Sequence, residues 1–186
     1  MPPLKPHVLG AGTVLHRIHR LIHGPIFFGP PSARPEQRFD DPEGVFKVLY
    51  LAFRLDTAFA ETLVRVPTAA NVLSTEVLAR GESEIATTRP VQLYPLNARL
   101  SAHRLTLAQV TSSRHRVPQR LSREIHEAHP TVDGIFYSSR FDGGHCVALF
   151  DRARDAIATT AMTGRPLTPE LAARIASQLG KNYVEP

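Results

Sequence analysis

The stretch of residues 45–53 (VFKVLYLAF) limits the possible folds more than any other part of the sequence. It is rich in β-branched and aromatic residues, and it has the length of a strand. It is also apolar enough to be a central strand, which lies between two other strands of a sheet. The rest of the chain therefore has to supply strands on both sides of it.

Strands and helices are mixed along the rest of the chain, without the strict βαβ alternation of a parallel sheet. The sequence therefore predicts an α+β fold, a single domain over residues 1–186 with a mixed β-sheet and flanking helices. Other strands are expected at 13–22, 134–139 and 145–150, the last two joined by a hairpin-like turn, with extended segments within 85–100 that Pro90 and Pro95 interrupt. Helices are expected from Asp56 or Thr57 to about Val66, at 75–80, 106–113 and 118–129, and after Thr168, which caps the last helix.

The composition excludes several classes of protein. Hydrophobic residues make up 42% of the chain and charged residues 21%, as in globular domains, so the chain is neither disordered nor fibrous. No apolar run is long enough to span a membrane, and the first residues (MPPLKP) lack the apolar segment of a signal peptide. The single cysteine, Cys146, cannot form an internal disulfide or a four-cysteine zinc site. We therefore expect a cytoplasmic protein that contacts no membrane.

The formal net charge of +5 favours anionic partners, such as nucleic acid, phosphorylated small molecules or an acidic protein. Only Lys5, Lys47 and Lys181 are lysines, and all other basic residues apart from histidine are arginines. Genomic base composition can cause such a bias. Selection for phosphate binding can also cause it, because the arginine fork binds phosphate in a bidentate manner.

Glu61 lies in a segment, residues 58–64 (AFAETLV), that is apolar around nearly the whole predicted helix. Such a helix is usually buried. A buried carboxylate needs a cation or a hydrogen-bond donor beside it, which makes Glu61 a candidate catalytic residue. The alternative is a surface glutamate that forms an ion pair with Arg65, one helical turn later.

Two further candidates lie just before and within the predicted central strand. Arg38 follows the proline-rich loop of residues 24–35 (GPIFFGPPSARP), so it stands at a loop–strand junction where an arginine can bind phosphate. The alternative is a solvated turn, since the Asp-Asp-Pro sequence nearby favours turns. Tyr50 lies in the middle of the strand, and its alternative is ordinary core packing with a hydrogen-bonded hydroxyl.

Five short stretches, in this order and at this spacing, resemble the RES domain family, which is named after an arginine, a glutamate and a serine. They are Arg17 within HRIH, Arg38-Phe39-Asp40, then Tyr50 within VLY and Glu61 within AFAETL, and Ser139 within DGIFYSSR. Many members of the family have Gly-Arg-Trp-Asn where this chain has Gln-Arg-Phe-Asp. This departure concerns the residues beside Arg38 and not the arginine itself.

The resemblance implies a fold like that of ADP-ribosyltransferases and the activity of a bacterial toxin that consumes NAD. NAD is then the substrate, and no bound cofactor is expected. Members of the family differ in the acceptor, which is water, phosphate or a protein side chain. The resemblance also implies an antitoxin partner that carries a DNA-binding domain, whose tail blocks the cleft in a toxin–antitoxin hetero-oligomer.

The same resemblance implies roles for single residues. Glu61 is the catalytic carboxylate, and Arg38 and Arg17 hold the NAD phosphates. Tyr50 packs on the nicotinamide, and Ser139 orients a ribose or nicotinamide group. These residue types suit cleavage of the nicotinamide–ribose bond, because a carboxylate stabilises the oxocarbenium-like centre while arginines neutralise the pyrophosphate.

His16, His19 and His23 are spaced three and four residues apart, a spacing that on a helix suits a metal site. In a strand, however, His16 and His19 point to opposite faces, so no metal is expected. His19 is instead expected to line the NAD pocket near Arg17. Cys146 is expected to be buried and inert.

The competing hypothesis is a basic nucleic-acid-binding or interaction protein without catalysis. Residues 105–125 contain two predicted helices in tandem, an arrangement like a helix-turn-helix, and carry the arginines Arg114, Arg116, Arg120 and Arg123. The turn lacks a glycine, Pro118 interrupts the second helix, and no aromatic residue is present there to stack on bases. A basic surface for an acidic partner protein accounts for these arginines equally well.

Overall fold

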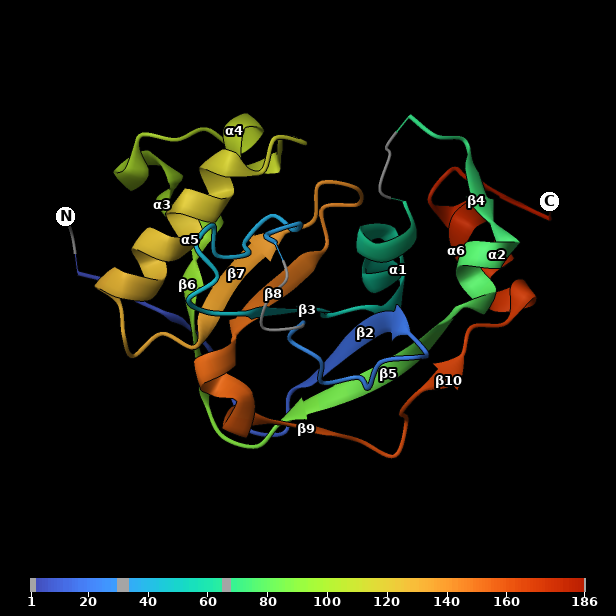
Figure 1. Ribbon diagram of the computed structural model, residues 1–186, viewed down its shortest axis with the longest axis horizontal. Coiled ribbons are helices and arrows are strands. Elements are labelled where there is room, and N and C mark those ends of the chain that lie inside the picture. Colours follow the sequence, from blue (N-terminus) through green and yellow to red (C-terminus); the bar gives the residue numbers. More distant parts are fainter. Residues whose placement is uncertain (1–2, 30–33, 65–67, 186) are drawn as a thin grey trace.

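The computed structural model describes residues 3–29, 34–64 and 68–185 (Figure 1). In these ranges nine strands form one mixed sheet in the order β1-β6-β7-β8-β3-β2-β5-β10, with β9 paired to β5, and β4 and β11 form a separate parallel pair. The strands are β1 (His7–Leu9), β2 (Val14–Arg20), β3 (Val48–Ala52), β4 (Asn71–Leu73), β5 (Arg80–Thr87), β6 (Val91–Pro95), β7 (Gly134–Ser138), β8 (His145–Phe150), β9 (Ile157–Thr159), β10 (Arg165–Pro166) and β11 (Asn182–Val184).

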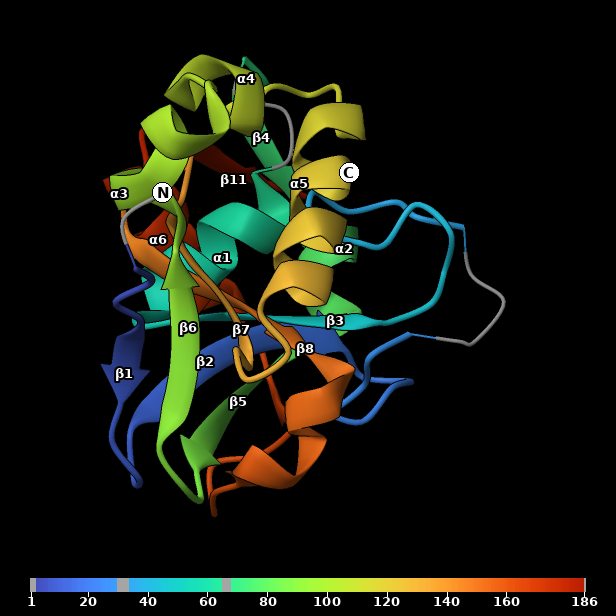
Figure 2. The same ribbon diagram turned by 90° about the vertical axis from the view of Figure 1, so that its left-hand side faces the viewer.

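The α-helices lie on one face of the sheet, in two groups (Figure 1). The first group, α3 to α5, lies beside β6 and β7, and the second, α1, α2 and α6, lies over β2 and β5. Figure 2 shows the β1–β6 edge of the sheet, with these helices above it. None of the described helices is long and apolar enough to cross a membrane. The helices are α1 (Leu55–Leu63), α2 (Ser74–Leu78), α3 (Leu96–Arg99), α4 (Leu107–Thr111), α5 (Arg116–Ala128) and α6 (Pro169–Gln178), with 3-10 turns η1 (Leu100–His103) and η2 (Asp151–Ala156).

The predicted central strand is confirmed as β3, which lies between β8 and β2. Its side chains alternate between two hydrophobic cores. Val48 and Ala52 belong to the core under the helices, whereas Leu49 and Leu51 belong to a second core on the opposite face. Burial on both faces is the reason why this stretch of sequence is apolar almost throughout.

The predicted start of this strand is wrong by three residues. β3 begins at Val48 and not at Val45, whose side chain is 70% exposed. The carboxylate of Asp41 accepts a hydrogen bond from the Val45 amide, and Gly44, with a φ of +74°, donates its amide to the Asp41 carbonyl oxygen (3.2 Å). These bonds close a turn that keeps Val45 out of the sheet.

The predicted cap of α1 is also wrong. The helix begins at Leu55 and has no side-chain cap. The carboxylate of Asp56 accepts a hydrogen bond from the Thr57 amide (2.8 Å) inside the first turn, so neither residue stands at the cap position. α1 ends at Leu63, and its predicted end at residue 66 lies outside the described residues.

Most other predicted elements are confirmed, with ends shifted by a few residues. They are β2, β7 and β8, the helices α2, α4 and α5, and the helix α6, whose cap Thr168 accepts a hydrogen bond from the Leu171 amide (3.2 Å). The end of the segment predicted to be extended is wrong, because α3 begins directly after Pro95. A proline can precede a helix at no cost, since the first helical amides need no partner within the helix.

The sheet divides between β2 and β3. β2 pairs with β5 along its whole length, and β3 pairs with β8 along its whole length. Between β2 and β3, in contrast, only His16 and Ala52 pair. Beyond this pair the strands diverge, so residues 17–20 and 48–51 leave room for a cleft between them.

Gly144 in the β7–β8 turn lies against Thr57 of α1. A Cβ atom there would lie 2.1 Å from the Thr57 hydroxyl oxygen, which donates a hydrogen bond to Asp142 (2.7 Å). We expect Gly144→Ala to lower the free energy of unfolding by about 1–3 kcal/mol, because Thr57 has to move. Urea denaturation measures this change.

Gly10→Ala is the matched control, because a Cβ atom there would meet no atom within 4 Å. Its stability should change by less than about 0.5 kcal/mol. If Gly144→Ala were as stable as Gly10→Ala, the turn and α1 would not be in tight steric contact at this position.

Candidate active site

A cleft of about 510 Å³ occupies the space between the diverging strands. Its walls come from β2, β3, α1, the β7–β8 turn and the link between α4 and α5. Five of the predicted site residues line it: Arg17, His19, Arg38, Tyr50 and Glu61. Ser139 is not among the described residues that line it.

Glu61 lies in the last turn of α1, after the fully buried residues Phe59 and Ala60. Its side chain faces the cleft, and its Oε1 atom is buried without a hydrogen-bond partner among the described residues. A buried carboxylate oxygen without a donor is costly, so its presence here points to a partner supplied by a ligand. Arg65, the alternative partner, lies outside the described residues.

Arg38 lies in the segment before β3 and is 7% exposed. Its guanidinium carbon is 5.9 Å from the ring centroid of Phe39 and 5.7 Å from that of Tyr137. Its Nε atom is buried and has no hydrogen-bond partner among the described residues. A cation that is held by aromatic rings and keeps an unused donor is suited to bind an anion in the cleft.

Tyr50 connects β3 to the segment that carries Arg38. Its hydroxyl donates a hydrogen bond to Asp40 (2.9 Å) and accepts one from the Phe39 amide (2.8 Å). Burial raises the pKa of Tyr50 well above its usual value, and Asp40 raises it further. The hydroxyl therefore stays neutral, and it fixes the backbone on which Arg38 stands.

Asp40 is the residue through which this connection is made. Besides the Tyr50 hydroxyl, its carboxylate accepts hydrogen bonds from the amides of Glu36 (3.0 Å) and Gln37 (2.8 Å). These bonds close the turn in front of Arg38. The residues beside Arg38, where the sequence departs from many RES members, thus organise the turn.

Arg17 is used in a way that the sequence did not predict. Its guanidinium donates hydrogen bonds to the carbonyl oxygens of Pro25 and Phe27, the latter at 3.2 Å. Burial lowers the pKa of Arg17 to about 10. Arg17 therefore fastens the loop after β2 to the cleft wall.

His19 is 6% exposed, and both of its ring nitrogens are engaged. Nδ1 lies 3.1 Å from the carbonyl oxygens of Arg20 and His23, and Nε2 lies 2.9 Å from the Ser83 hydroxyl. Because carbonyls only accept, Nδ1 carries the proton, and Nε2 of the neutral ring can accept from Ser83. Burial lowers the pKa of His19, in agreement with this neutral form.

Ser139 belongs to the turn between β7 and β8. It is 4% exposed, and its hydroxyl oxygen accepts a hydrogen bond from the Phe141 amide (3.2 Å). Its own amide donates to Gly144, and its carbonyl accepts from Gly143. In this arrangement Ser139 stabilises the turn, one residue away from the cleft wall.

A family model of the RES domain matches residues 14–170. The chain belongs to the RES domain family. The resemblance carried by the five short stretches is thus confirmed. No curated protein matches the chain significantly.

Among solved structures, one chain of the MbcT–MbcA toxin–antitoxin complex of M. tuberculosis has a similar fold. The TM-score is 0.71, and the alignment covers 91% of this RES domain and 92% of that chain. The predicted α+β fold with a mixed sheet is confirmed. The two sequences are 14% identical, so the similarity concerns the fold.

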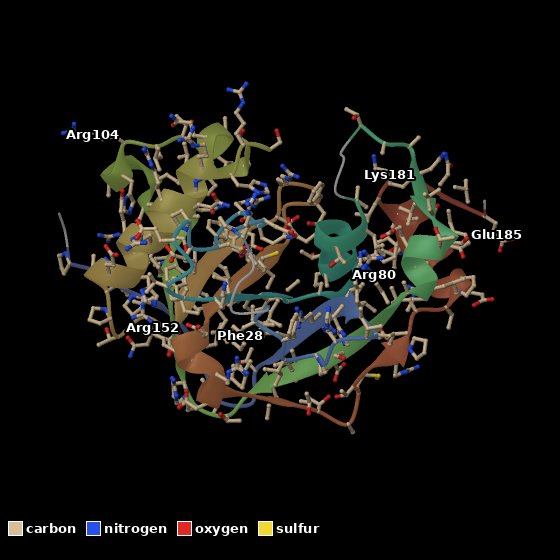
Figure 3. All side chains as sticks on the ribbon, in the orientation of Figure 1. Phe28, Arg80, Arg104, Arg152, Lys181 and Glu185 are labelled. Carbon is tan, nitrogen blue, oxygen red and sulfur yellow. The ribbon has the colours of Figure 1, made fainter. Side chains whose placement is uncertain are left out.

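Several residues that line the cleft of this RES domain were not predicted. Arg140 and Phe141 reach it from the β7–β8 turn, and His115 reaches it from the start of α5. Arg80, which is 5% exposed and forms an ion pair with Glu76 (2.7 Å), also lines it and lies between α1 and α2 in Figure 3. Of these residues, only Arg140 could have been suspected from the sequence, because it directly follows Ser139 of the family stretch.

Cys146 is buried as predicted, at 1% exposure, and it lines the cleft. Burial raises the pKa of its thiol, and the nearby Glu61 raises it further. The thiol therefore stays protonated and is a poor nucleophile. Among the described residues, no three histidine, cysteine or acidic side chains gather where they could hold a metal ion.

The arrangement of α4 and α5 does not support a helix-turn-helix. α4 covers only Leu107–Thr111, which is little more than one turn. Arg123 of α5 forms ion pairs with Glu43 (2.8 Å), Glu127 (2.9 Å) and Asp41 (3.4 Å). Its guanidinium is therefore already paired with acidic residues of the chain itself.

The Tyr50 hydroxyl gives a direct test of how the arginine segment is held. Tyr50→Phe removes two hydrogen bonds and should lower the free energy of unfolding by about 1–2 kcal/mol. Tyr183→Phe is the control, because its buried hydroxyl has no hydrogen-bond partner among the described residues. Its stability should be unchanged or slightly higher. Equal urea midpoints for the two variants would contradict the role given to Tyr50.

The lowered pKa of buried histidines predicts a pH dependence of stability. Burial lowers the pKa of His19, His103 and His126 below their ordinary value of 6.5. The unfolded chain then binds protons more readily than the folded protein, so stability is present above pH 6.5 and is lost as the pH falls below it. Melting temperatures measured from pH 7.5 to 5 should decrease. A flat profile over this range would show that protonation of these histidines does not lower the stability of the folded protein.

Proposed function

We propose that this protein is the toxin of a bacterial type II toxin–antitoxin pair and that it cleaves the nicotinamide–ribose bond of NAD. Membership of the RES domain family supports the proposal, and so does the similar fold of a chain from a toxin–antitoxin complex. The observation that carries it is the carboxylate of Glu61, which lies in the cleft with a buried oxygen that has no hydrogen-bond partner within residues 3–29, 34–64 and 68–185.

Glu61 and Arg38 both influence the pKa values of two buried side chains, Cys146 and Tyr137. Burial raises the pKa of the Cys146 thiol, Glu61 raises it further, and Arg38 lowers it. The pKa of Tyr137 is raised by burial and by Glu61 and is lowered by Arg38. A negative and a positive group therefore face one cleft, as a substrate with a cationic ring and an anionic diphosphate requires.

The reaction needs a group that stabilises positive charge. When the bond between the ribose C1′ and the nicotinamide nitrogen breaks, the electron pair leaves with nicotinamide, and the ribose becomes an oxocarbenium-like centre. The carboxylate of Glu61 stabilises this centre and accepts a hydrogen bond from a ribose hydroxyl. Nicotinamide leaves as a neutral ring, so no acid is needed, and the buried Cys146 has no part in the step.

The other site residues bind and orient NAD in this proposal. Arg38 binds the diphosphate, and the ring of Tyr50 packs against the nicotinamide while its hydroxyl holds the arginine segment. Arg17 and His19 act on the loop after β2, which forms the outer wall of the cleft. The acceptor of the ADP-ribosyl group is water, phosphate or a protein side chain.

The proposal includes an antitoxin partner. The solved neighbour belongs to a toxin–antitoxin complex, which supports a hetero-oligomer of this chain with an antitoxin. In this proposal the antitoxin carries a DNA-binding domain. The tail of the antitoxin would cover the cleft, and the pair would act in the bacterial cytoplasm.

Incubation of the purified protein with NAD tests the proposed reaction. We expect release of nicotinamide, measured by chromatography, with and without added phosphate and with a bacterial lysate as a source of protein acceptors. ADP-ribose, ADP-ribose phosphate or a mass increase of a lysate protein identifies the acceptor. No loss of NAD under any of these conditions would contradict the proposal.

Glu61→Gln separates catalysis from folding. It keeps the volume of the side chain but removes the charge, so we expect normal folding, NAD affinity within a few-fold, and turnover at least about 100-fold slower. Glu124→Gln on α5, whose side chain is 67% exposed, removes the same charge outside the cleft and should leave turnover unchanged. Near-normal turnover in a well-folded Glu61→Gln protein would rule out its catalytic role.

A further inference from the structure

The turn between β7 and β8 brings a second arginine into the cleft. Arg140 lines the same cleft as Arg38 and Glu61, but from the turn that follows β7, a different segment of the chain. We propose that Arg140 and Arg38 together clamp the diphosphate of a dinucleotide ligand. This inference rests on the proposed function, since it names the group by which the same cleft binds NAD.

The guanidinium of Arg140 is held in a defined place. It lies 4.7 Å from the ring centroid of Phe141, and its Nη1 atom donates a hydrogen bond to the Thr111 carbonyl oxygen at the end of α4 (3.3 Å). An aromatic ring and a carbonyl oxygen thus fix the position of the group. A guanidinium fixed in this way has lost much of its conformational entropy before a ligand binds.

The electrostatics of the cleft favour a ligand with more than one negative charge. Burial lowers the pKa of Arg140, Arg38 lowers it further, and Glu61 raises it. The guanidinium groups of Arg140 and Arg38 thus repel each other, and the carboxylate of Glu61 partly offsets their positive charge. An anion between the two arginines removes this repulsion, and a diphosphate offers oxygens to both forks at once.

The position of Arg140 relative to the catalytic carboxylate is fixed by the turn itself. The hydroxyl of Thr57 on α1 donates to the Asp142 carboxylate (2.7 Å), which also accepts a hydrogen bond from the Gly144 amide (3.1 Å). The Ser139 hydroxyl holds the other side of the turn through the Phe141 amide. The turn is therefore attached to the helix that carries Glu61, which sets the spacing between the clamp and the reacting bond.

Arg17 is less suited to this task than Arg140. Two of its donors are used by the carbonyl oxygens of Pro25 and Phe27. Phe27 in turn stacks on His23, with ring centroids 4.3 Å apart. Movement of Arg17 toward a phosphate would release this loop.

The experiment compares two ligands that differ in phosphate. ADP-ribose contains the diphosphate, and nicotinamide riboside contains none. For Arg140→Gln we expect affinity for ADP-ribose to fall by about tenfold or more, as for the loss of charged hydrogen bonds, while affinity for nicotinamide riboside stays within about threefold. Isothermal titration calorimetry measures both. Arg120→Gln on α5, an exposed arginine that does not line the cleft, controls for net charge and should change neither affinity.

Equal losses for both ligands in Arg140→Gln, or unchanged affinity for ADP-ribose, would overturn the clamp. If Arg140→Gln does not fold, Arg140→Lys keeps the charge but not the fork and should show the same ligand-selective loss to a smaller extent. If the wild-type protein binds neither ligand, inorganic pyrophosphate is the probe. Pyrophosphate binding that is lost in Arg140→Gln would then support the clamp, whatever the outcome of the NAD assay. Wild-type protein that does not bind pyrophosphate either would overturn the clamp, whereas the NAD assay alone decides the proposed reaction.

Discussion

The divergence of β2 from β3 is the constraint on which the rest of this structure depends. Neighbouring strands normally satisfy each other's backbone groups, so a gap within a sheet leaves amides and carbonyls that need other partners. Here side chains provide part of the solution. The Thr62 hydroxyl of α1 lies 3.5 Å from the Ile18 carbonyl oxygen. Arg17 in turn holds the loop that follows β2 beside the gap through the carbonyl oxygens of Pro25 and Phe27. The cleft fills the gap, with α1 and the loop among its walls.

The parts of the fold that the sequence predicts are those with a strong local signal. The apolar stretch of β3 and the Thr168 cap of α6 are recognisable because each depends on neighbouring residues. The apolar surroundings of Glu61 also indicate a buried helix without any knowledge of its partners. The parallel pair of β4 and β11 gives no such signal, since each strand is three residues long and the pairing joins distant parts of the chain.

The candidate site is predictable as a set of residue types and not as a set of contacts. The family stretches select Arg38, Tyr50 and Glu61, and the structure brings all three to one cleft. The sequence cannot show that Arg17 binds two backbone carbonyls, because any acceptor within reach satisfies a guanidinium. It also cannot show that the Tyr50 hydroxyl is used by Asp40, because that bond depends on how the intervening turn closes.

The close contact between Gly144 and Thr57 has a consequence for how this sequence can vary. At Gly134 a Cβ atom would lie 2.4 Å from the backbone oxygen of Ala148, and no substitution elsewhere removes a backbone atom. At Gly144 the obstacle is the side chain of Thr57, which a smaller residue would remove. In this register, position 134 therefore accommodates only glycine. A side chain at position 144 fits without strain only where position 57 carries a residue smaller than threonine, so the evolution of the turn is coupled to that of the helix it touches.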